Sequence, residues 1–322
     1  MKEFFNLLGW KDLIVVFLAL ILIRISIIIP FYNQWYLPPS ISWENFLMFA
    51  FGICFLFAGN NIAVKFYDEK TKVLSQTSTT TLNIKDYPDI ARLRGLWVVL
   101  WFVGIIAVCY SCIKIGSQYY YIALAVITLL IGYAYASYLR HSFLLGNLSL
   151  AVLYSAVILS QLPHDSAVLV PYSYKFPNPA AITYNDLSVL FICLAALVFF
   201  LTLLRDMTGD VTNTEDDKKM NYPTLGVKLG INRSKTVLYA ISIIFILLNG
   251  VFLYFYAEKI GVTQVILTII LSVVPVIYCM VLLRKAKLQT DFNYLYVCLG
   301  VIYISLLFVI SFCKYLFIHG NL

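Results

Sequence analysis

The sequence turns from apolar to polar in Leu203-Leu-Arg205-Asp206-Met-Thr-Gly-Asp210-Val-Thr-Asn213-Thr-Glu-Asp-Asp217-Lys-Lys219, at the end of a long apolar run. The chain of 322 residues has 16 Asp and Glu residues, and five of them fall in positions 205–219. On a helix, positions 206, 210, 213 and 217 follow the spacing i, i+4, i+7 and i+11, so their side chains share one face. Three carboxylates and a carboxamide supply the hard oxygen ligands that Mg²⁺ prefers. The alternative is a solvated loop between two membrane helices, where charged residues also belong.

Composition places the chain in a membrane. It is 61% hydrophobic and 12% charged, with a mean hydropathy of +0.87, and these values exclude a soluble domain of this size. Because an unpaired backbone polar group in lipid costs several kcal/mol, the spanning segments must be helices. We therefore expect an all-α polytopic protein with nine transmembrane helices, one for each apolar run long enough to cross a hydrocarbon core of ~30 Å. The runs are 12–30, 42–59, 95–115, 119–138, 146–162, 184–205, 236–256, 262–283 and 293–318.

Two long polar connections interrupt this series of spans. They are residues 60–94, after the second span, and residues 206–235, after the sixth. This spacing predicts one integral membrane domain over 1–322 that is built of two halves, 1–140 and 141–322. The first span is long and lacks a small-residue cleavage site, so no cleavable signal peptide is apparent.

The positive charges are distributed asymmetrically. If the N-terminus is cytoplasmic, the cytoplasmic segments carry 18 of the 23 Lys and Arg residues and the opposite side carries three, while Arg24 and Lys314 lie within spans. The positive-inside rule then predicts a cytoplasmic N-terminus, a C-terminus on the opposite side and cytoplasmic polar connections. The net charge of +7 indicates topology and attraction to anionic membrane lipid or diphosphate, not a nucleic-acid partner. The seven cysteines all fall in predicted spans, which favours packing roles over disulfides or zinc.

Two stretches resemble a known family. One is Asp210-Val-Thr-Asn213-Thr-Glu215-Asp-Asp217-Lys-Lys-Met-Asn-Tyr-Pro-Thr224-Leu225-Gly-Val-Lys-Leu-Gly230, and the other is Tyr135-Ala-Ser-Tyr-Leu-Arg140-His-Ser-Phe-Leu-Leu-Gly146-Asn147. The first is similar, without a gap, to a motif of the form Asp-x-x-Asp-x-Glu-Gly-Asp-Arg/Lys-Lys followed by Gly, Thr-Leu and Leu-Gly. The second is similar to Tyr-Ser-x-x-Leu-Lys-Arg-x-x-x-x-Gly-Asn. Both patterns belong to the UbiA superfamily of intramembrane prenyltransferases, which also has nine helices and polar cytoplasmic loops after helices 2 and 6.

The resemblance implies a metal site in the second polar connection. Its ligands would be Asp210, Asn213 and Asp217, with Asp206 an additional carboxylate one turn earlier. Asn213 stands where the family has Asp, and an amide oxygen still ligates Mg²⁺ with one negative charge less. Asn221 replaces a Gly of the family, and Asn tolerates the left-handed conformation better than most residues do.

The first polar connection departs further from the family. The family's pattern there is Asn-Asp-x-x-Asp-x-x-x-Asp, and in the alignment on Phe66-Tyr67-Asp68 these positions fall on Val64, Lys65, Asp68 and Lys72. Only Asp68 keeps a carboxylate. Two ammonium groups at carboxylate positions oppose a second Mg²⁺ by Coulomb repulsion, although either one could contact diphosphate directly.

The reaction implied by the resemblance is the transfer of a prenyl group. An allylic polyprenyl diphosphate ionises with Mg²⁺ as cofactor, and an aromatic or other lipophilic acceptor in the membrane captures the carbocation. The expected metal ligands are Asp206, Asp210, Asn213, Asp217 and Asp68, with Asp210, Asp217 and Asp68 as the catalytic carboxylates. The expected substrate-binding residues are Tyr135 at the reactive carbon or acceptor, and Arg140, Lys65, Lys72, Lys218 and Asn61 at the diphosphate end.

Two other functions are compatible with the sequence. A degenerate relative that binds isoprenoid without turnover is suggested by Lys65 and Lys72. A transporter would share the hydropathy but would be expected to place ionisable residues near the bilayer midplane, where this chain has few. The product class expected of the enzyme is a quinone precursor, a tetrapyrrole or an ether lipid, and the expected location is the bacterial inner membrane.

Overall fold

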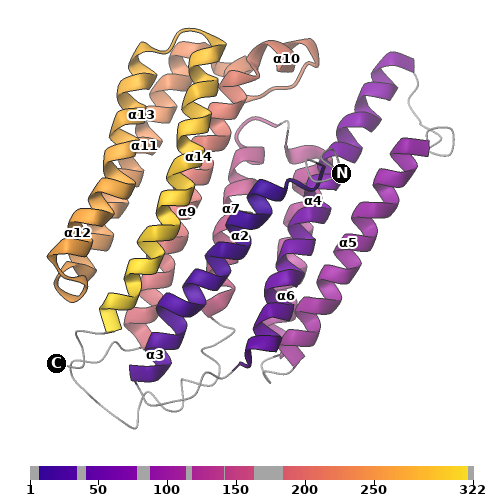
Figure 1. The fold of residues 1–322 in the computed structure, drawn as a ribbon. Coiled ribbons are helices and arrows are strands. Elements are labelled where there is room, and N and C mark those ends of the chain that lie inside the picture. The colour runs from indigo at the N-terminus through magenta and orange to yellow at the C-terminus, as the bar shows by residue number, and fades with distance from the viewer. Residues whose placement is uncertain are drawn as a thin grey trace. The chain divides into compact units, whose positions relative to one another are not determined.

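A computed structural model describes residues 7–34, 41–77, 88–113, 118–140, 142–162 and 184–317. Every regular element in these ranges is helical, which confirms the all-α prediction (Figure 1). Among the described residues, seven helices are long and apolar enough to cross a membrane. Two of the predicted spans, 119–138 and 146–162, fall on the shorter apolar helices Val126–Leu139 and Leu145–Leu159. The exterior is rich in exposed apolar side chains, among them Tyr254, Phe102 and Val262, as suits a lipid environment.

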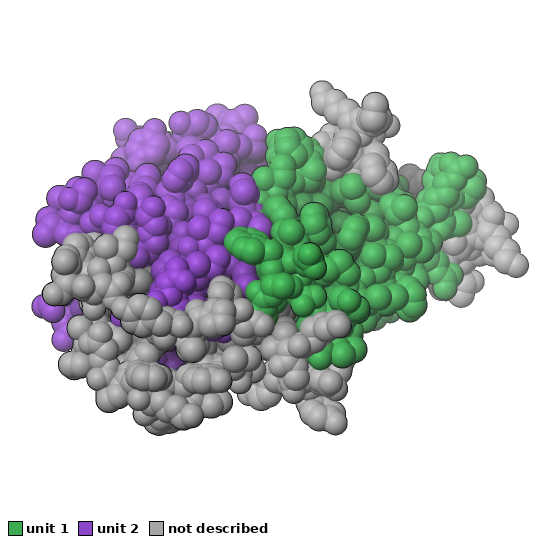
Figure 2. Space-filling model, turned by 60° about the horizontal axis from the view of Figure 1, so that its bottom comes forward, with its two compact units in different colours: residues 1–17, 41–140 green, residues 18–40, 141–322 purple. Residues whose placement is uncertain are grey.

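The chain forms two compact units, which Figure 2 distinguishes by colour. The first comprises residues 1–17 and 41–140, and the second comprises residues 18–40 and 141–322. The N-terminal helix α2 (Trp10–Ile23) contributes to both.

The first unit is built around a close helix pair, α4 (Trp43–Thr77) and α5 (Pro88–Ile113). Glycines allow the two backbones to approach. A Cβ atom at Gly52 would lie 3.1 Å from the carbonyl oxygen of Gly104, and one at Gly104 would lie 3.0 Å from that of Gly52. Small residues at a crossing are the usual means by which membrane helices gain van der Waals contact. Helix α6 (Gln118–Ala134) follows and ends in the π-helical turn η3 (Tyr135–Leu139).

The second unit surrounds α9 (Tyr184–Thr212), which packs against α7 (Leu145–Leu159), α11 (Leu225–Ile260) and α14 (Gln289–Phe312) (Figure 1). Leu190, Phe191 and Leu201 of α9 are almost completely buried, so this helix forms the core of the unit. The remaining elements are η1 (Arg24–Ile28), α3 (Ile29–Gln34), α10 (Thr214–Lys219), α12 (Val262–Thr268), η4 (Ile269–Val273), α13 (Val274–Lys285) and η5 (Cys313–Phe317).

The two polar connections begin later than predicted. Helix α4 continues to Thr77 and α9 continues to Thr212, so residues 60–77 and 206–212 are helical and not loops. The reason is that one face of each extension is still apolar and buried. Ile62 and Phe66 on α4, and Met207 and Val211 on α9, keep the helix packed while polar residues occupy its other faces. Residues 78–87 of the first connection lie outside the described part, and residues from Pro88 onward already belong to α5.

Candidate functional site

The polar end of α9 carries two acidic residues one helical turn apart. Asp206 and Asp210 stand beside the buried positions Met207 and Val211, which fix the orientation of this turn against the rest of the second unit. Because side chains at i and i+4 lie above one another on a helix, both carboxylates project from the same strip of the surface. The predicted pairing of Asp206 with Asp210 is therefore present in the structure.

A side chain from another helix joins these two carboxylates. Asn147 of α7 is 3% exposed, and its Nδ2 group donates to Oδ2 of Asp206 at 3.0 Å and to Oδ2 of Asp210 at 3.1 Å. The backbone N–H of Leu225, the first residue of α11, lies 3.5 Å from the same oxygen of Asp210. The Oδ1 atom of Asn147 is buried and has no hydrogen-bond partner among the residues that the structure describes. A buried acceptor without a donor is costly in a protein, so this atom is suited to a cation or to a donor on a ligand.

The helix is interrupted between α9 and α10 (Thr214–Lys219). Asn213 adopts φ −93° and ψ 10° between α9 and α10 and is exposed, so the prediction of a single uninterrupted helical face through position 217 was wrong. In the described part of the chain, no hydrogen bond links the side chain of Asn213 to Asp206 or Asp210. The adjacent Lys218 is exposed on α10.

Asp217 is held by the turn that leads into α11. Its Oδ2 accepts a hydrogen bond of 2.8 Å from the hydroxyl of Thr224, and its backbone oxygen accepts one of 2.9 Å from the N–H of Tyr222. Asn221 between them has φ +56°, the left-handed conformation expected at the position where the family has Gly. The carboxylate of Asp217 is thus fixed by the turn and not by the helix that carries Asp210.

Arg205, next to Asp206, is held by aromatic rings. Its guanidinium carbon lies 4.7 Å from the ring centroid of Tyr296 and 5.7 Å from that of Tyr303, both on α14. Such cation–π contacts stabilise a charge that has left water. No sequence pattern indicated this arrangement, because the tyrosines lie about a hundred positions away in the chain. Asn147 could have been found, since it ends a stretch that resembles the family, but its type alone suggested no role.

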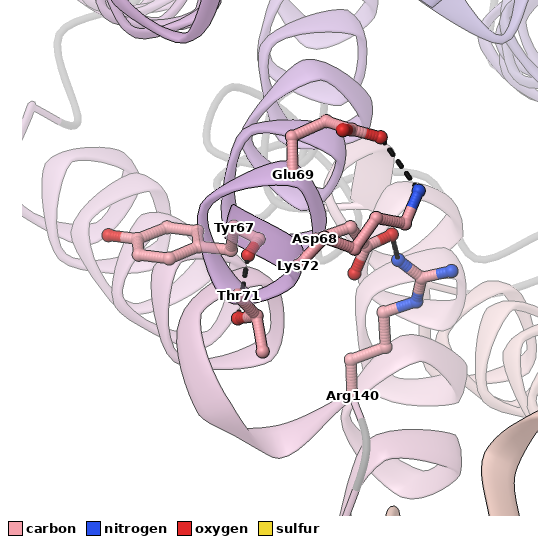
Figure 3. Close-up of polar contacts among 6 residues, drawn as sticks. All are labelled: Tyr67, Asp68, Glu69, Thr71, Lys72 and Arg140. Carbon is pink, nitrogen blue, oxygen red and sulfur yellow. Dashed lines mark hydrogen bonds and ion pairs between the residues drawn. The ribbon is translucent and has the colours of Figure 1, made fainter. Parts of the chain in front are cut away.

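In the first unit, charged side chains of residues 64–72, called the first motif below, form ion pairs. Nη1 of Arg140 lies 2.5 Å from Oδ2 of Asp68, and Nζ of Lys72 lies 2.8 Å from Oε1 of Glu69 (Figure 3). Lys65 is half-buried on the same helix, α4. The structure therefore brings Arg140 to the carboxylate that was expected to bind metal.

Two other residues of this unit, Asn61 and Tyr135, were predicted to bind substrate. Asn61 donates from Nδ2 to the backbone oxygen of Leu8 at 3.0 Å, which ties α4 to the start of the chain. Tyr135 is 8% exposed and opens the π-helical turn η3. Their roles toward substrate stay predictions.

The first motif and the second motif, which contains Asp206, Asp210 and Asp217, differ in how well they fit a divalent cation. In the second unit, Asp206, Asp210 and the orphaned Oδ1 of Asn147 offer hard oxygens, and Mg²⁺ typically takes one or two carboxylates and completes its shell with water and phosphate. In the first unit, the carboxylate of Asp68 is already paired with a guanidinium. Among the described residues, no three His, Cys, Asp or Glu side chains form a preassembled metal-binding group. The second motif thus fits the metal with water and substrate as further ligands, and the first does not.

The fold is shared with solved intramembrane enzymes. A structure of digeranylgeranylglyceryl phosphate synthase is similar at a TM-score of 0.64 and 19% identity, covering 97% of this chain and 98% of that one. A UbiA homologue from Aeropyrum pernix K1 is similar at 0.58 and 14%, covering 90% and 96%. A UbiA homologue from Archaeoglobus fulgidus, bound to GPP and Mg²⁺, is similar at 0.58 and 13%, covering 96% and 99%. Neither any protein-family model nor any curated protein matches the chain.

Three findings agree on the architecture of the chain. They are its helical elements, the seven long apolar helices among the described residues, and the structural similarity over nearly the whole length. The chain shares its fold with these solved UbiA homologues and with the digeranylgeranylglyceryl phosphate synthase structure.

Proposed function

We propose that this protein is a Mg²⁺-dependent prenyltransferase that acts in the membrane on an allylic polyprenyl diphosphate. The observation that carries the proposal is the convergence of Asp206, Asp210 and Asn147 at the polar end of the core helix of the second unit. Nearly every other part of that helix is apolar, so a cluster of two carboxylates there has no packing function. The relatives with this fold include one bound to GPP and Mg²⁺ and one bound to DMAPP and Mg²⁺, which supports a diphosphate substrate.

Each residue of the cluster has a separable task in this proposal. Asp206 and Asp210 hold the cation, and Asn147 keeps the two carboxylates together by donating to both. Thr224 orients Asp217 through a hydrogen bond, which places a third carboxylate at the turn into α11. Bound Mg²⁺ would neutralise the charge that develops on the diphosphate as the allylic C–O bond breaks.

The substrate is apolar apart from its diphosphate, and the acceptor is lipophilic. A prenyl chain lies most favourably against the apolar helices, with its charged end at the polar end of α9. The acceptor then captures the allylic carbocation and loses a proton, and the diphosphate released by cleavage of the C–O bond is the second product. The similarity to a synthase of digeranylgeranylglyceryl phosphate supports a lipid-like acceptor alongside the aromatic one that the sequence suggested.

The test is pyrophosphate release by the purified full chain in detergent, with Mg²⁺, prenyl diphosphates of several lengths and a membrane extract as the acceptor source. We expect release that depends on Mg²⁺, and a loss on the order of 100-fold or more in Asp210→Asn, because a metal contributes several kcal/mol to this kind of charge stabilisation. Asp216→Asn is the matched control, since the carboxylate of Asp216 is exposed and pairs with Lys219, three positions along the chain. This variant should keep the activity of the wild type.

Two results would contradict the proposal. Release that is equally fast in EDTA would exclude the metal role, and release that survives in Asp210→Asn would exclude the second motif as the site. Binding of prenyl diphosphate without any release would instead favour the non-catalytic relative, an alternative suggested by the ion pairs of the first motif.

A further inference from the structure

The first motif presents one face of α4 on which cations outnumber carboxylates. Lys65, Asp68 and Lys72 follow the spacing i, i+3 and i+7, so their side chains share that face. Figure 3 shows the side chains of Asp68, Lys72 and Arg140 on one side of α4, and the ring of Tyr67 on the other. Arg140, at the end of η3, adds a third positive charge to this face.

Both carboxylates of this segment are already neutralised by the chain itself. Oδ2 of Asp68 accepts from Nη1 of Arg140 at 2.5 Å, with the two side chains 28% and 35% exposed. Oε1 of Glu69 accepts from Nζ of Lys72 at 2.8 Å. A cation with two charges would have to displace a guanidinium from Asp68 and then remain beside the ammonium groups of Lys65 and Lys72. Hard metal ions favour sites with several carboxylates, whereas on this face the one carboxylate, Asp68, is already paired and has positively charged side chains around it.

The second motif differs from the first in the charges that surround its carboxylates. There the two carboxylates of Asp206 and Asp210 share a neutral amide donor from Asn147. The cationic Arg205 beside them lies against the rings of Tyr296 and Tyr303. The two motifs of the chain therefore have opposite electrostatic character.

From this contrast we infer that the first motif binds no metal ion and instead binds a phosphate-type anion directly through Lys65 and Lys72, with Asp68 acting as a positioning residue for Arg140. The inference rests on the proposed function for the chemical class of the anion, a diphosphate. It predicts one metal site per chain, located in the second motif.

The metal part is tested by counting bound Mn²⁺ per chain with electron paramagnetic resonance, on the purified full chain. We expect about one Mn²⁺ in the wild type, the same number in Asp68→Asn, and loss of the ion in Asp210→Asn. Conversely, Lys65→Asp combined with Lys72→Asp places three carboxylates on one helical face and should add a second Mn²⁺. Two ions in the wild type, with one lost in Asp68→Asn, would overturn the inference and leave the proposed function intact.

A wild type that binds no Mn²⁺ would contradict the proposed function and not the inference. In that case the variant with both Lys65→Asp and Lys72→Asp still tests the inference. Binding of a Mn²⁺ ion by this variant would support the inference that the two lysines exclude metal, and no binding would contradict it. Thermal unfolding of each variant shows whether the fold is kept.

The anion part is tested by calorimetric titration with inorganic pyrophosphate in EDTA. Binding should weaken roughly tenfold or more when Lys65 and Lys72 are both replaced by Gln, because each ammonium group would lose a charge-assisted hydrogen bond to the anion. Lys70→Gln is the matched control: Lys70 lies on the same helix, two positions from Lys72, and therefore points away from the shared face. Equal weakening by Lys70→Gln, or binding that requires Mg²⁺, would contradict a direct anion site.

Discussion

At the scale of single residues, the candidate site depends on an amide that bridges two carboxylates. Asn147 is buried, and its Nδ2 group is within hydrogen-bond distance of both Asp206 and Asp210. Two carboxylates held one turn apart on a helix repel each other, and a shared donor offsets part of that repulsion. The residue is therefore a positioning residue for both presumed metal ligands, and its own Oδ1 remains available to the site.

Replacing Asn147 by Ala should lower pyrophosphate release by roughly 10–100-fold, the usual effect of removing a partner that orients metal ligands. The affinity for Mn²⁺ should fall by a similar factor, which a purely structural role would not produce. Ser149→Ala is the control on the same helix, because the hydroxyl of Ser149 donates to the backbone oxygen of Gly146 within that helix. Full activity and unchanged metal affinity in Asn147→Ala would show that the bridge has no function.

At the scale of helices, the first unit depends on close approach of α4 and α5. A Cβ atom at Gly52 would lie 2.8 Å from Cγ2 of Val108 and 3.1 Å from the backbone oxygen of Gly104. Backbone atoms cannot move aside as the end of a side chain can, so a larger residue must push the helices apart.

Gly52→Val should destabilise the protein by about 1–3 kcal/mol, the usual cost of overpacking, and lower its thermal unfolding temperature in detergent. Gly95→Ala is the comparison within the same helix pair. A Cβ atom at Gly95 would meet nothing within 4 Å, and Ala favours helix over Gly by about 0.5–1 kcal/mol, so this variant should be unchanged or more stable. A Gly52→Val protein as stable as the wild type would mean that the helix pair is looser than described.

At the scale of the whole molecule, the distribution of charge predicts which ends of the helices face the cytoplasm. The polar turn with Asp216 and the connection before Val262 lie at opposite ends of α11, and both residues are exposed. Asp216→Cys should react with a membrane-impermeant maleimide from the cytoplasmic side only, and Val262→Cys from the other side only, each in a background without the seven native cysteines. Labelling of both positions from one side would contradict the predicted orientation.

Much of the architecture could be predicted because composition and periodicity are local properties. A chain that is 61% hydrophobic must form helices in a membrane, and the spacing of Asp206 and Asp210 by four positions places them together on any helix. The ends of the helices were less predictable. Residues 60–77 and 206–212 look like polar connections, and they are helical because their apolar minority is buried against neighbouring helices.

The sequence by itself determined the class of the protein, the helical character of its spans and the position of its acidic motif, since each follows from residues that are near one another in the chain. Only the tertiary structure decided which side chains complete the motifs. Asn147 meets Asp206 and Asp210 across 59 and 63 positions, and Arg140 meets Asp68 across 72. Periodicity reports the faces of one helix and carries no information about which other helix packs against that face. For that reason, only the packed fold showed the amide of Asn147 in the second motif and the guanidinium of Arg140 at the first. In our proposal, the amide makes the second motif suited to a metal ion and the guanidinium makes the first unsuited.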